Sequence, residues 1–122
     1  MHGKPNCILH RDLKLGNLFL DSKMQIKIGD FGLATQLASE VDMRASICGT
    51  PNYMAPEILM AAEEDKKLAE GALCGYSFAA DIWALGVIMY TMVVGRPPFE
   101  TPVVEDTYKK IKSVNYTFPT AE

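Results

Sequence analysis

The stretch His10-Arg11-Asp12-Leu13-Lys14-Leu15-Gly16-Asn17 decides the fold of this chain. It places a carboxylate, an ammonium group and a side-chain amide at short fixed offsets, and the apolar run Leu18-Phe19-Leu20 follows at once. An apolar run directly after such a polar segment predicts a short strand that leaves a loop. A second polar segment, Asp30-Phe31-Gly32, lies further along the chain. The sequence therefore predicts functional loops joined by short strands.

The residues around these loops have strand patterns. Cys7-Ile8-Leu9 is a short apolar run before the first loop, and residues 24–28 alternate apolar and polar side chains. Period-2 alternation is typical of a half-buried strand. Asp21-Ser22-Lys23 favours a turn between the second and third strands. The first third of the chain thus predicts a hairpin beside the first loop.

The remaining residues predict a long loop followed by helices. Residues 36–53 lack periodicity, which predicts a functional loop. Ala55-Pro56-Glu57 opens a short helix, because proline is tolerated in a first helical turn. Residues 60–75 are rich in Ala, Glu and Lys and favour either a solvated helix or an insertion.

The longest apolar run, Ile82 to Val94, predicts a buried helix that is too short to span a bilayer. Ser77 can cap this helix, and Gly95 ends it. Residues 103–112 predict a last, amphipathic helix. The expected fold class is α+β, mainly α, with residues 1–122 forming one domain or one piece of a domain.

Composition excludes several classes of function. The net charge of -3 comes without any cluster of Lys or Arg, so neither nucleic acid nor a membrane is an expected partner. Cys7, Cys48 and Cys74 are odd in number and irregularly spaced, which argues against a disulfide framework or a zinc site. The first residues lack the apolar core of a signal peptide. Reduced thiols in an intracellular compartment are expected.

The two polar loops carry side chains suited to phosphoryl transfer. That reaction needs a hydroxyl held in line with the terminal phosphate, and cations that neutralise the developing charge. Asp12 can orient the hydroxyl and accept its proton, and Lys14 can meet the transferred phosphate. Asn17 and Asp30 supply the hard oxygen ligands that Mg²⁺ prefers. Each residue alone fits an ordinary turn or core role, but the ordered set favours the functional interpretation.

The motifs together resemble the C-terminal lobe of eukaryotic protein kinases, and the resemblance covers almost the whole chain. It rests on His10 to Asn17, Asp30-Phe31-Gly32, Ala55-Pro56-Glu57 and Asp81-Ile82-Trp83. Lys14 and Gly49-Thr50-Pro51 are similar to serine/threonine rather than tyrosine kinases. Within the family the chain most resembles polo-like kinases, which share Leu13 to Leu20, Cys48 to Tyr53 and Arg96 to Thr101.

The resemblance implies ATP and Mg²⁺ as cofactors and a protein substrate with a Ser or Thr hydroxyl. The implied catalytic residues are Asp12, Lys14 and Thr50. The implied nucleotide contacts are Lys14, Asn17, Phe19 and Asp30, of which Asn17 and Asp30 hold the metal. Phe19 is either the floor of the adenine pocket or an ordinary strand aromatic. Structural support is implied for His10, Phe31, Gly32, Glu57 and Asp81, with Asp81 fixing the catalytic-loop backbone.

Two further residues have implied roles in regulation and specificity. Ser46 lies at the usual position of the activating phosphosite, where a phosphate would pair with Arg11 and order the loop. The alternative is an ordinary loop serine. Gly16 stands where many basic-directed kinases carry an acidic residue, and by resemblance polo-like enzymes tolerate or prefer acidic residues near the target. The family also implies the cytoplasm or nucleus, and the spindle or centrosome, as the location.

The chain departs from the family at its two ends. No Gly-rich loop, strand lysine or helix glutamate precedes Met1, so the nucleotide lobe is expected to be a missing partner and the chain alone is expected to be inactive. The arginine that pairs with Glu57 in the family would follow Glu122, so an unpaired buried carboxylate costing about 3–5 kcal/mol is expected. We also expect the apolar residues of Ile82 to Val94 to be partly exposed. The alternatives are a non-catalytic lobe that binds or regulates, and a partial gene product.

Overall fold

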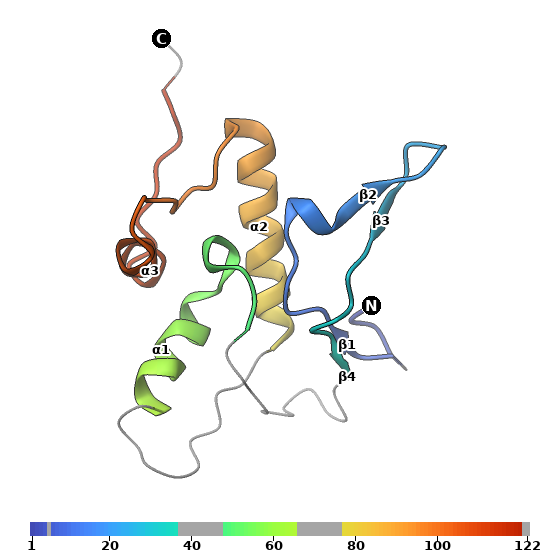
Figure 1. The fold of residues 1–122 in the computed structure, drawn as a ribbon, viewed down its shortest axis with the longest axis horizontal. Helices are drawn as coiled ribbons and strands as arrows, with labels where there is room; N and C mark the ends of the chain where they lie inside the picture. The colour runs from blue at the N-terminus through green and yellow to red at the C-terminus, as the bar shows by residue number, and fades with distance from the viewer. Residues whose placement is uncertain (5, 37–47, 66–76, 121–122) are drawn as a thin grey trace.

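The structure is a computed structural model that describes residues 1–4, 6–36, 48–65 and 77–120. Short strands lie at the N-terminal end and helices form the rest (Figure 1). The strands are β1 (Ile8–Leu9), β2 (Leu18–Leu20), β3 (Ile26–Ile28) and β4 (Thr35–Gln36). The helices are α1 (Pro56–Asp65), α2 (Phe78–Val94) and α3 (Val104–Lys112), with 3-10 turns at Leu15–Asn17 and Pro51–Tyr53. The described chain is mainly helical with a few short strands, as predicted.

The predicted hairpin is confirmed. Strands β2 and β3 pair antiparallel, with Phe19 opposite Lys27, and β1 pairs antiparallel with β4. In the turn, Asp21 Oδ1 accepts hydrogen bonds from the backbone amides of Lys23 at 2.8 Å and Gln25 at 3.0 Å. The prediction that residues 24–28 form a half-buried strand is wrong, because all three residues of β3 are exposed. The hairpin projects away from the helices (Figure 1), and every strand residue in it except the half-buried Leu18 is exposed.

The helix boundaries follow from capping residues that the sequence predicted. Ser77 Oγ accepts a hydrogen bond from the Ala79 amide at 3.2 Å at the start of α2. Gly95 ends the helix in a left-handed conformation with φ of +88°, and its amide donates to the Thr91 carbonyl at 2.8 Å. Helix α1 extends from Pro56 only to Asp65, and residues 66–75 of the predicted insertion lie outside the described residues.

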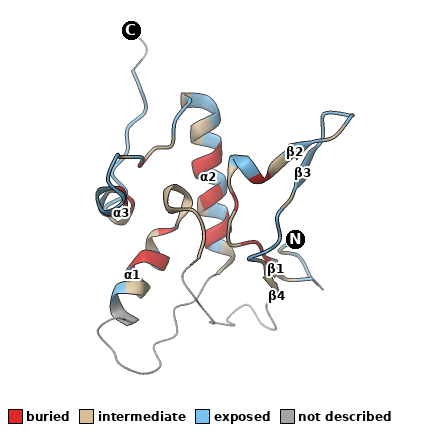
Figure 2. Cartoon of the chain, in the orientation of Figure 1, coloured by how far each residue is buried: buried red, intermediate tan, exposed pale blue. Residues whose placement is uncertain are grey.

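Helix α2 contributes to all three buried clusters of the core. In the first cluster Ala80 of α2 lies with Leu9 of β1 and Ile58 of α1. The second cluster consists of Leu59, Val87, Phe99 and Ile111. In the third, Leu13 packs on Ala84 and Ile88. The buried face of α2 carries Ala80, Asp81, Ala84, Val87 and Ile88 (Figure 2). The loop that contains Asp12 is therefore anchored on α2 through Leu13.

The opposite face of α2 is exposed. It carries large apolar side chains at helical spacing, namely Ile82, Leu85, Met89, Met92 and Val93. The expected partial exposure of this run is confirmed. The prediction of a buried helix is wrong for this face, because its large apolar side chains remain exposed. No helix among the described residues is both long enough and apolar enough to cross a membrane.

Candidate active site

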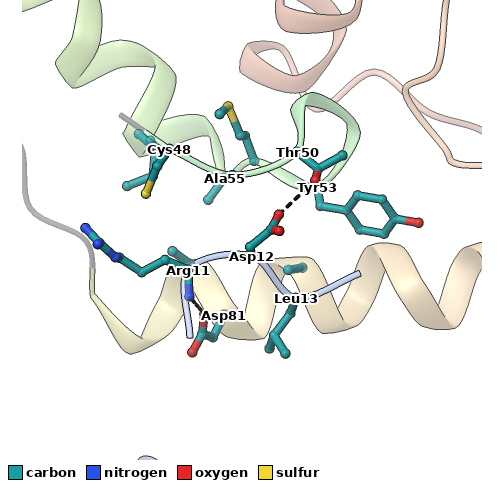
Figure 3. Close-up of a pocket in the computed structure, with 13 residues that line it drawn as sticks. Arg11, Asp12, Leu13, Cys48, Thr50, Tyr53, Ala55 and Asp81 are labelled. Atoms are coloured by element: carbon teal, nitrogen blue, oxygen red, sulfur yellow. Dashed lines mark hydrogen bonds between the residues drawn. The ribbon is translucent and has the colours of Figure 1, made fainter. Parts of the chain in front are cut away.

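Asp12 lies between β1 and β2 and is bonded to two predicted site residues. Thr50 donates its hydroxyl hydrogen to Asp12 Oδ1 at 2.8 Å (Figure 3). Lys14 Nζ donates to Thr50 Oγ1 at 3.0 Å and lies 3.1 Å from Asp12 Oδ2. The Asp12 side chain is only 11% exposed. These three side chains form a cluster that joins the loop after β1 to the 3-10 turn at Pro51–Tyr53.

Gly49 permits this close approach of the two segments. Its φ is +111°, and a Cβ atom added there would stand 2.9 Å from the Arg11 carbonyl oxygen. Any larger residue would combine a strained backbone with a clash against another backbone. Gly49 therefore allows Thr50 to reach Asp12.

Asp81 holds the backbone directly before Asp12. Its carboxylate, 2% exposed, accepts the His10 amide at 2.9 Å and the Arg11 amide at 3.0 Å. Figure 3 shows Asp81 beside Arg11. His2 Nε2 lies 2.7 Å from Asp81 Oδ2. The sequence interpretation missed His2, since no local pattern relates two residues 79 positions apart. The Asp81 carboxylate is thus stabilised by three donors, two of which belong to the loop.

His10 connects the Asp12 loop to the Asp30 loop. Its side chain is fully buried, its Nδ1 accepts the Asp12 amide at 3.3 Å and its Nε2 donates to the Gly29 carbonyl at 2.9 Å. Because Nδ1 accepts, the ring proton lies on Nε2. The ring also contacts Phe31 edge-on, at 4.9 Å between centroids. Segments 19 residues apart are therefore held in a fixed relation.

Two residues beside the site adopt the left-handed backbone conformation that favours glycine. They are Arg11, with φ of +68°, and Asp30, with φ of +55°. Such conformations cost free energy and persist only where surrounding contacts impose them. The Asp81 bond to the Arg11 amide is one such contact, and Asp30 Oδ1 accepts the Gly32 amide at 3.3 Å.

Asn17 and Asp30 are placed as neighbours by backbone bonding. The Gly29 amide, one residue before Asp30, donates to the Asn17 carbonyl at 2.9 Å. Asn17 Nδ2 donates to the Asp12 carbonyl at 2.9 Å, so the side chain turns its amide nitrogen toward the loop and its oxygen is the atom left for a cation. The Asp30 carboxylate is on an exposed residue. Each residue therefore offers a hard oxygen ligand.

These donors fit magnesium bound together with a nucleotide. No group of three or more His, Cys, Asp or Glu side chains within the described ranges could hold a metal ion without other ligands. Mg²⁺ is commonly bound by one or two protein oxygens together with substrate phosphates and water. Two such oxygens are what Asn17 and Asp30 provide.

The structure describes three of the four remaining predicted residues, Phe19, Arg11 and Gly32. Phe19 lies on β2 with 55% of its surface exposed, and Arg11 Nε donates to the Leu33 carbonyl at 2.6 Å. Ser46 lies outside the described residues. Gly32 binds Asp30 through its amide.

The expectation that Glu57 is a buried carboxylate is not met. Glu57 is exposed in the first turn of α1, so the predicted unpaired buried carboxylate is wrong. A carboxylate in the first turn is stabilised by the helix dipole and remains solvated.

Comparisons with known proteins agree with this arrangement. The family model described as the protein kinase domain matches residues 1–120. The chain is 54% identical over 114 residues to the serine/threonine-protein kinase polo of Drosophila melanogaster, an alignment that covers 93% of this chain and 18% of the relative. It is 51% identical over 114 residues to the serine/threonine-protein kinase PLK1 of Xenopus laevis, with 93% and 17% covered.

A third relative gives the same result. The probable cell cycle serine/threonine-protein kinase CDC5 homolog of Encephalitozoon cuniculi is 54% identical over 112 residues, with 92% of this chain and 21% of the relative covered. The chain thus spans about a fifth of the length of these relatives. The resemblance to serine/threonine kinases of the polo-like group is confirmed. With residues 1–120 matched, this chain belongs to the protein kinase family.

Proposed function

We propose that residues 1–122 are the catalytic-lobe portion of an ATP-dependent protein serine/threonine kinase. The observation that carries this proposal is the cluster of Asp12, Lys14 and Thr50, in which one nearly buried carboxylate is held by a hydroxyl and an ammonium group. Similarity to serine/threonine kinases named polo and PLK1 supports the same reaction class.

Asp12 is equipped to act as the base. A carboxylate offers about four acceptor positions. In this cluster Thr50 takes one and Lys14 another, and Asn17 Nδ2 lies at 3.4 Å from Oδ2. One position is therefore left for the hydroxyl of a substrate. Asp12 accepts that proton as the substrate oxygen bonds to the terminal phosphorus of ATP and the bond from this phosphorus to the leaving ADP oxygen breaks.

Lys14, together with the magnesium ligands Asn17 and Asp30, would neutralise the negative charge on the phosphates. Lys14 Nζ lies within the cluster and brings a compact positive charge to the side of Asp12 where the phosphoryl group is transferred. Asn17 and Asp30 would hold magnesium, which neutralises the phosphate charge when bound with ATP. His10 and Asp81 keep these loops in register, because Asp81 accepts the backbone amides of His10 and Arg11, and the His10 ring joins the Asp12 amide to the Gly29 carbonyl.

The proposed enzyme needs a second lobe that holds the nucleotide from the other side. This chain alone is proposed to be inactive, with that lobe of the same kinase as its partner and a protein Ser or Thr as its substrate. We further propose an acidic surrounding for the target, activation by phosphate on Ser46, and action in the cytoplasm or nucleus. The spindle and centrosome are the locations that the polo-like resemblance favours.

Transfer of labelled phosphate from ATP to casein by the full-length gene product tests the proposal. Asp12→Asn should lower kcat by about 10²- to 10⁴-fold, the usual contribution of a positioned base. The matched control is Asp106→Asn, which removes an exposed carboxylate on α3 that bonds only to Lys109 among the described residues. Full activity of the Asp12 variant would refute the role of the base. Nucleotide binding without transfer by the unmodified protein would favour the non-catalytic alternative.

A further inference from the structure

Asn52 and Glu100 join two segments that are 48 positions apart in the sequence. Asn52 lies in the 3-10 turn at Pro51–Tyr53, and its Nδ2 donates to Glu100 Oε1 at 3.4 Å. Glu100 belongs to the connection between α2 and α3. The bond therefore brings a carboxylate from this connection to the turn that follows Thr50.

The turn has a fixed position relative to Asp12. The Tyr53 amide donates to the Thr50 carbonyl at 2.9 Å, and the Thr50 hydroxyl donates to Asp12 Oδ1 at 2.8 Å (Figure 3). Asn52 lies between Thr50 and Tyr53 in the sequence. A protein substrate whose hydroxyl group reaches Asp12 therefore passes close to Asn52.

The backbone that carries Glu100 is held on both sides. Phe99, directly before it, is 3% exposed and belongs to the core cluster on which Tyr53 packs. The amide of Thr101, directly after it, donates to Thr107 Oγ1 at 3.1 Å. A group that is already fixed loses less freedom when it binds a ligand, so the position of Glu100 favours binding.

The Glu100 carboxylate has acceptor positions left for a further partner. Glu100 is exposed, and no Lys or Arg side chain within the described ranges forms an ion pair with it. A carboxylate offers about four acceptor positions, of which the Asn52 amide takes one. Lysine ammonium and arginine guanidinium groups are the side chains that bind such a carboxylate most strongly.

We infer that Glu100 is a specificity-determining residue that binds a lysine or arginine of the protein substrate, with Asn52 as the positioning residue for its carboxylate. This inference rests on the proposed kinase function and deepens it. Two turn residues and two side chains separate Thr50 from the carboxylate, a path of roughly 10–20 Å. An extended peptide rises about 3.3 Å per residue, so the basic residue should lie about three to six positions from the target. It adds to the acidic residues proposed nearer the target.

The test uses the full-length protein and peptides that share one acidic target sequence. A single lysine or glutamine is moved through every position on each side of the phosphorylated serine, and kcat/KM of the lysine peptide is divided by that of the glutamine peptide. Within the expected interval this ratio should rise about threefold to fivefold, the effect of one exposed ion pair, and the gain should appear in KM rather than kcat. The ratio should fall as the salt concentration rises, because exposed charges are screened.

Three variants assign the preference to the carboxylate. Glu100→Gln keeps the shape and the oxygen that accepts from Asn52, and it should abolish the lysine preference. Glu100→Lys should reverse it, so that glutamate is preferred over lysine at the same position. Asn52→Ala should weaken it, because the carboxylate is then free to turn. Glu105→Gln, which removes an exposed carboxylate from the first turn of α3, is the matched control and should keep the full preference.

Several outcomes would overturn the inference. They are a lysine preference that persists in Glu100→Gln, an equal loss in Glu105→Gln, a preference that salt does not change, and transfer without any lysine preference in the unmodified protein. Full preference in Asn52→Ala would overturn the positioning role of Asn52. All of these outcomes include phosphate transfer and so leave the proposed kinase function intact. Absence of transfer from the unmodified protein to every peptide would refute both proposals together.

Discussion

Thr50 donates its hydroxyl hydrogen to Asp12 Oδ1 at 2.8 Å, across 38 positions of sequence. The bond fixes the orientation of the carboxylate, and Lys14 closes the cluster by donating to the same hydroxyl oxygen. The segment after residue 47 therefore sets the geometry of the loop after β1. Loss of this bond should affect the reaction more than substrate binding.

Thr50→Val tests that expectation, because valine keeps the shape of threonine and removes the hydroxyl. A hydrogen bond to a charged group contributes about 1.5–3 kcal/mol, so kcat should fall by about 10- to 100-fold. The KM for ATP should stay the same. Thr50→Ser retains the hydroxyl and should keep most of the activity in the same assay. Equal losses in both variants would show that the methyl group, not the hydroxyl, matters.

Asp81→Asn should destabilise the catalytic loop. The carboxylate accepts from the His10 and Arg11 amides and lies 2.7 Å from His2, and an asparagine has only one acceptor oxygen. An unsatisfied buried group costs about 1–3 kcal/mol. Thermal denaturation followed by circular dichroism should show a lower Tm, and hydrogen exchange should accelerate at the His10 and Arg11 amides. Asp106→Asn on α3 should change neither measurement.

Asp21 makes the hairpin turn sensitive to acid. The hydrogen bond from the Gln25 amide, helped by the Lys23 amide and Lys27, lowers the pKa of Asp21 from its ordinary value of 3.8. A lowered folded-state pKa means that the ionised carboxylate stabilises the turn at neutral pH. This contribution is lost as the pH falls below 3.8 and through the folded-state pKa.

Amide chemical shifts of Lys23 and Gln25, measured by NMR against pH, report this transition directly. Both should titrate together with a midpoint below 3.8. In Asp21→Asn neither amide should titrate in this range. A midpoint at or above the ordinary value in the unmodified chain would contradict the bonding seen in the turn.

Local signals in the sequence predicted the elements well, because they act within a few residues. Ser77 and Gly95 fix the ends of α2 through their own backbone and side-chain preferences. Alternation correctly predicted the strand β3 but wrongly predicted that it is half-buried. Whether a face is covered depends on which distant segment meets it, so the exposure of β3 and of Glu57 was not predictable from periodicity. The exposure of the outer face of α2 was expected only from the family resemblance.

In the candidate site, too, the sequence predicted local features but not contacts between distant residues. The spacing of Asp12, Lys14 and Asn17 within one loop suggested shared chemistry from the sequence alone. Thr50 was placed in the catalytic set only by family resemblance. The contact of His2 with Asp81 followed neither from spacing nor from the resemblance. Long-range pairs depend on packing around α2, which composition and spacing do not encode.

The exposed apolar face of α2 should make the 122-residue chain self-associate. Ile82, Leu85 and Met89 lie on one helical face and are each more than 40% exposed, and apolar patches of this kind promote association. Sedimentation velocity should show oligomers, and the hydrophobic dye ANS should bind. Met89→Lys should reduce both signals, whereas Glu105→Lys on the polar side of α3 should not. A monomer without dye binding would contradict this expectation.

Gly16→Glu tests how the loop selects substrates. Gly16 is exposed and nothing lies within 4 Å of an added Cβ, so a glutamate can be accommodated without disturbing the Asp12 cluster. The new carboxylate would stand four residues after Asp12 on the surface of the same loop, where it can attract a substrate arginine. In the full-length kinase, kcat/KM should shift by about tenfold toward peptides with basic residues before the target, a change of about 1.4 kcal/mol. Gly16→Gln, which has the same shape and no charge, should leave the preference unchanged, so a shift in both variants would point to shape rather than charge.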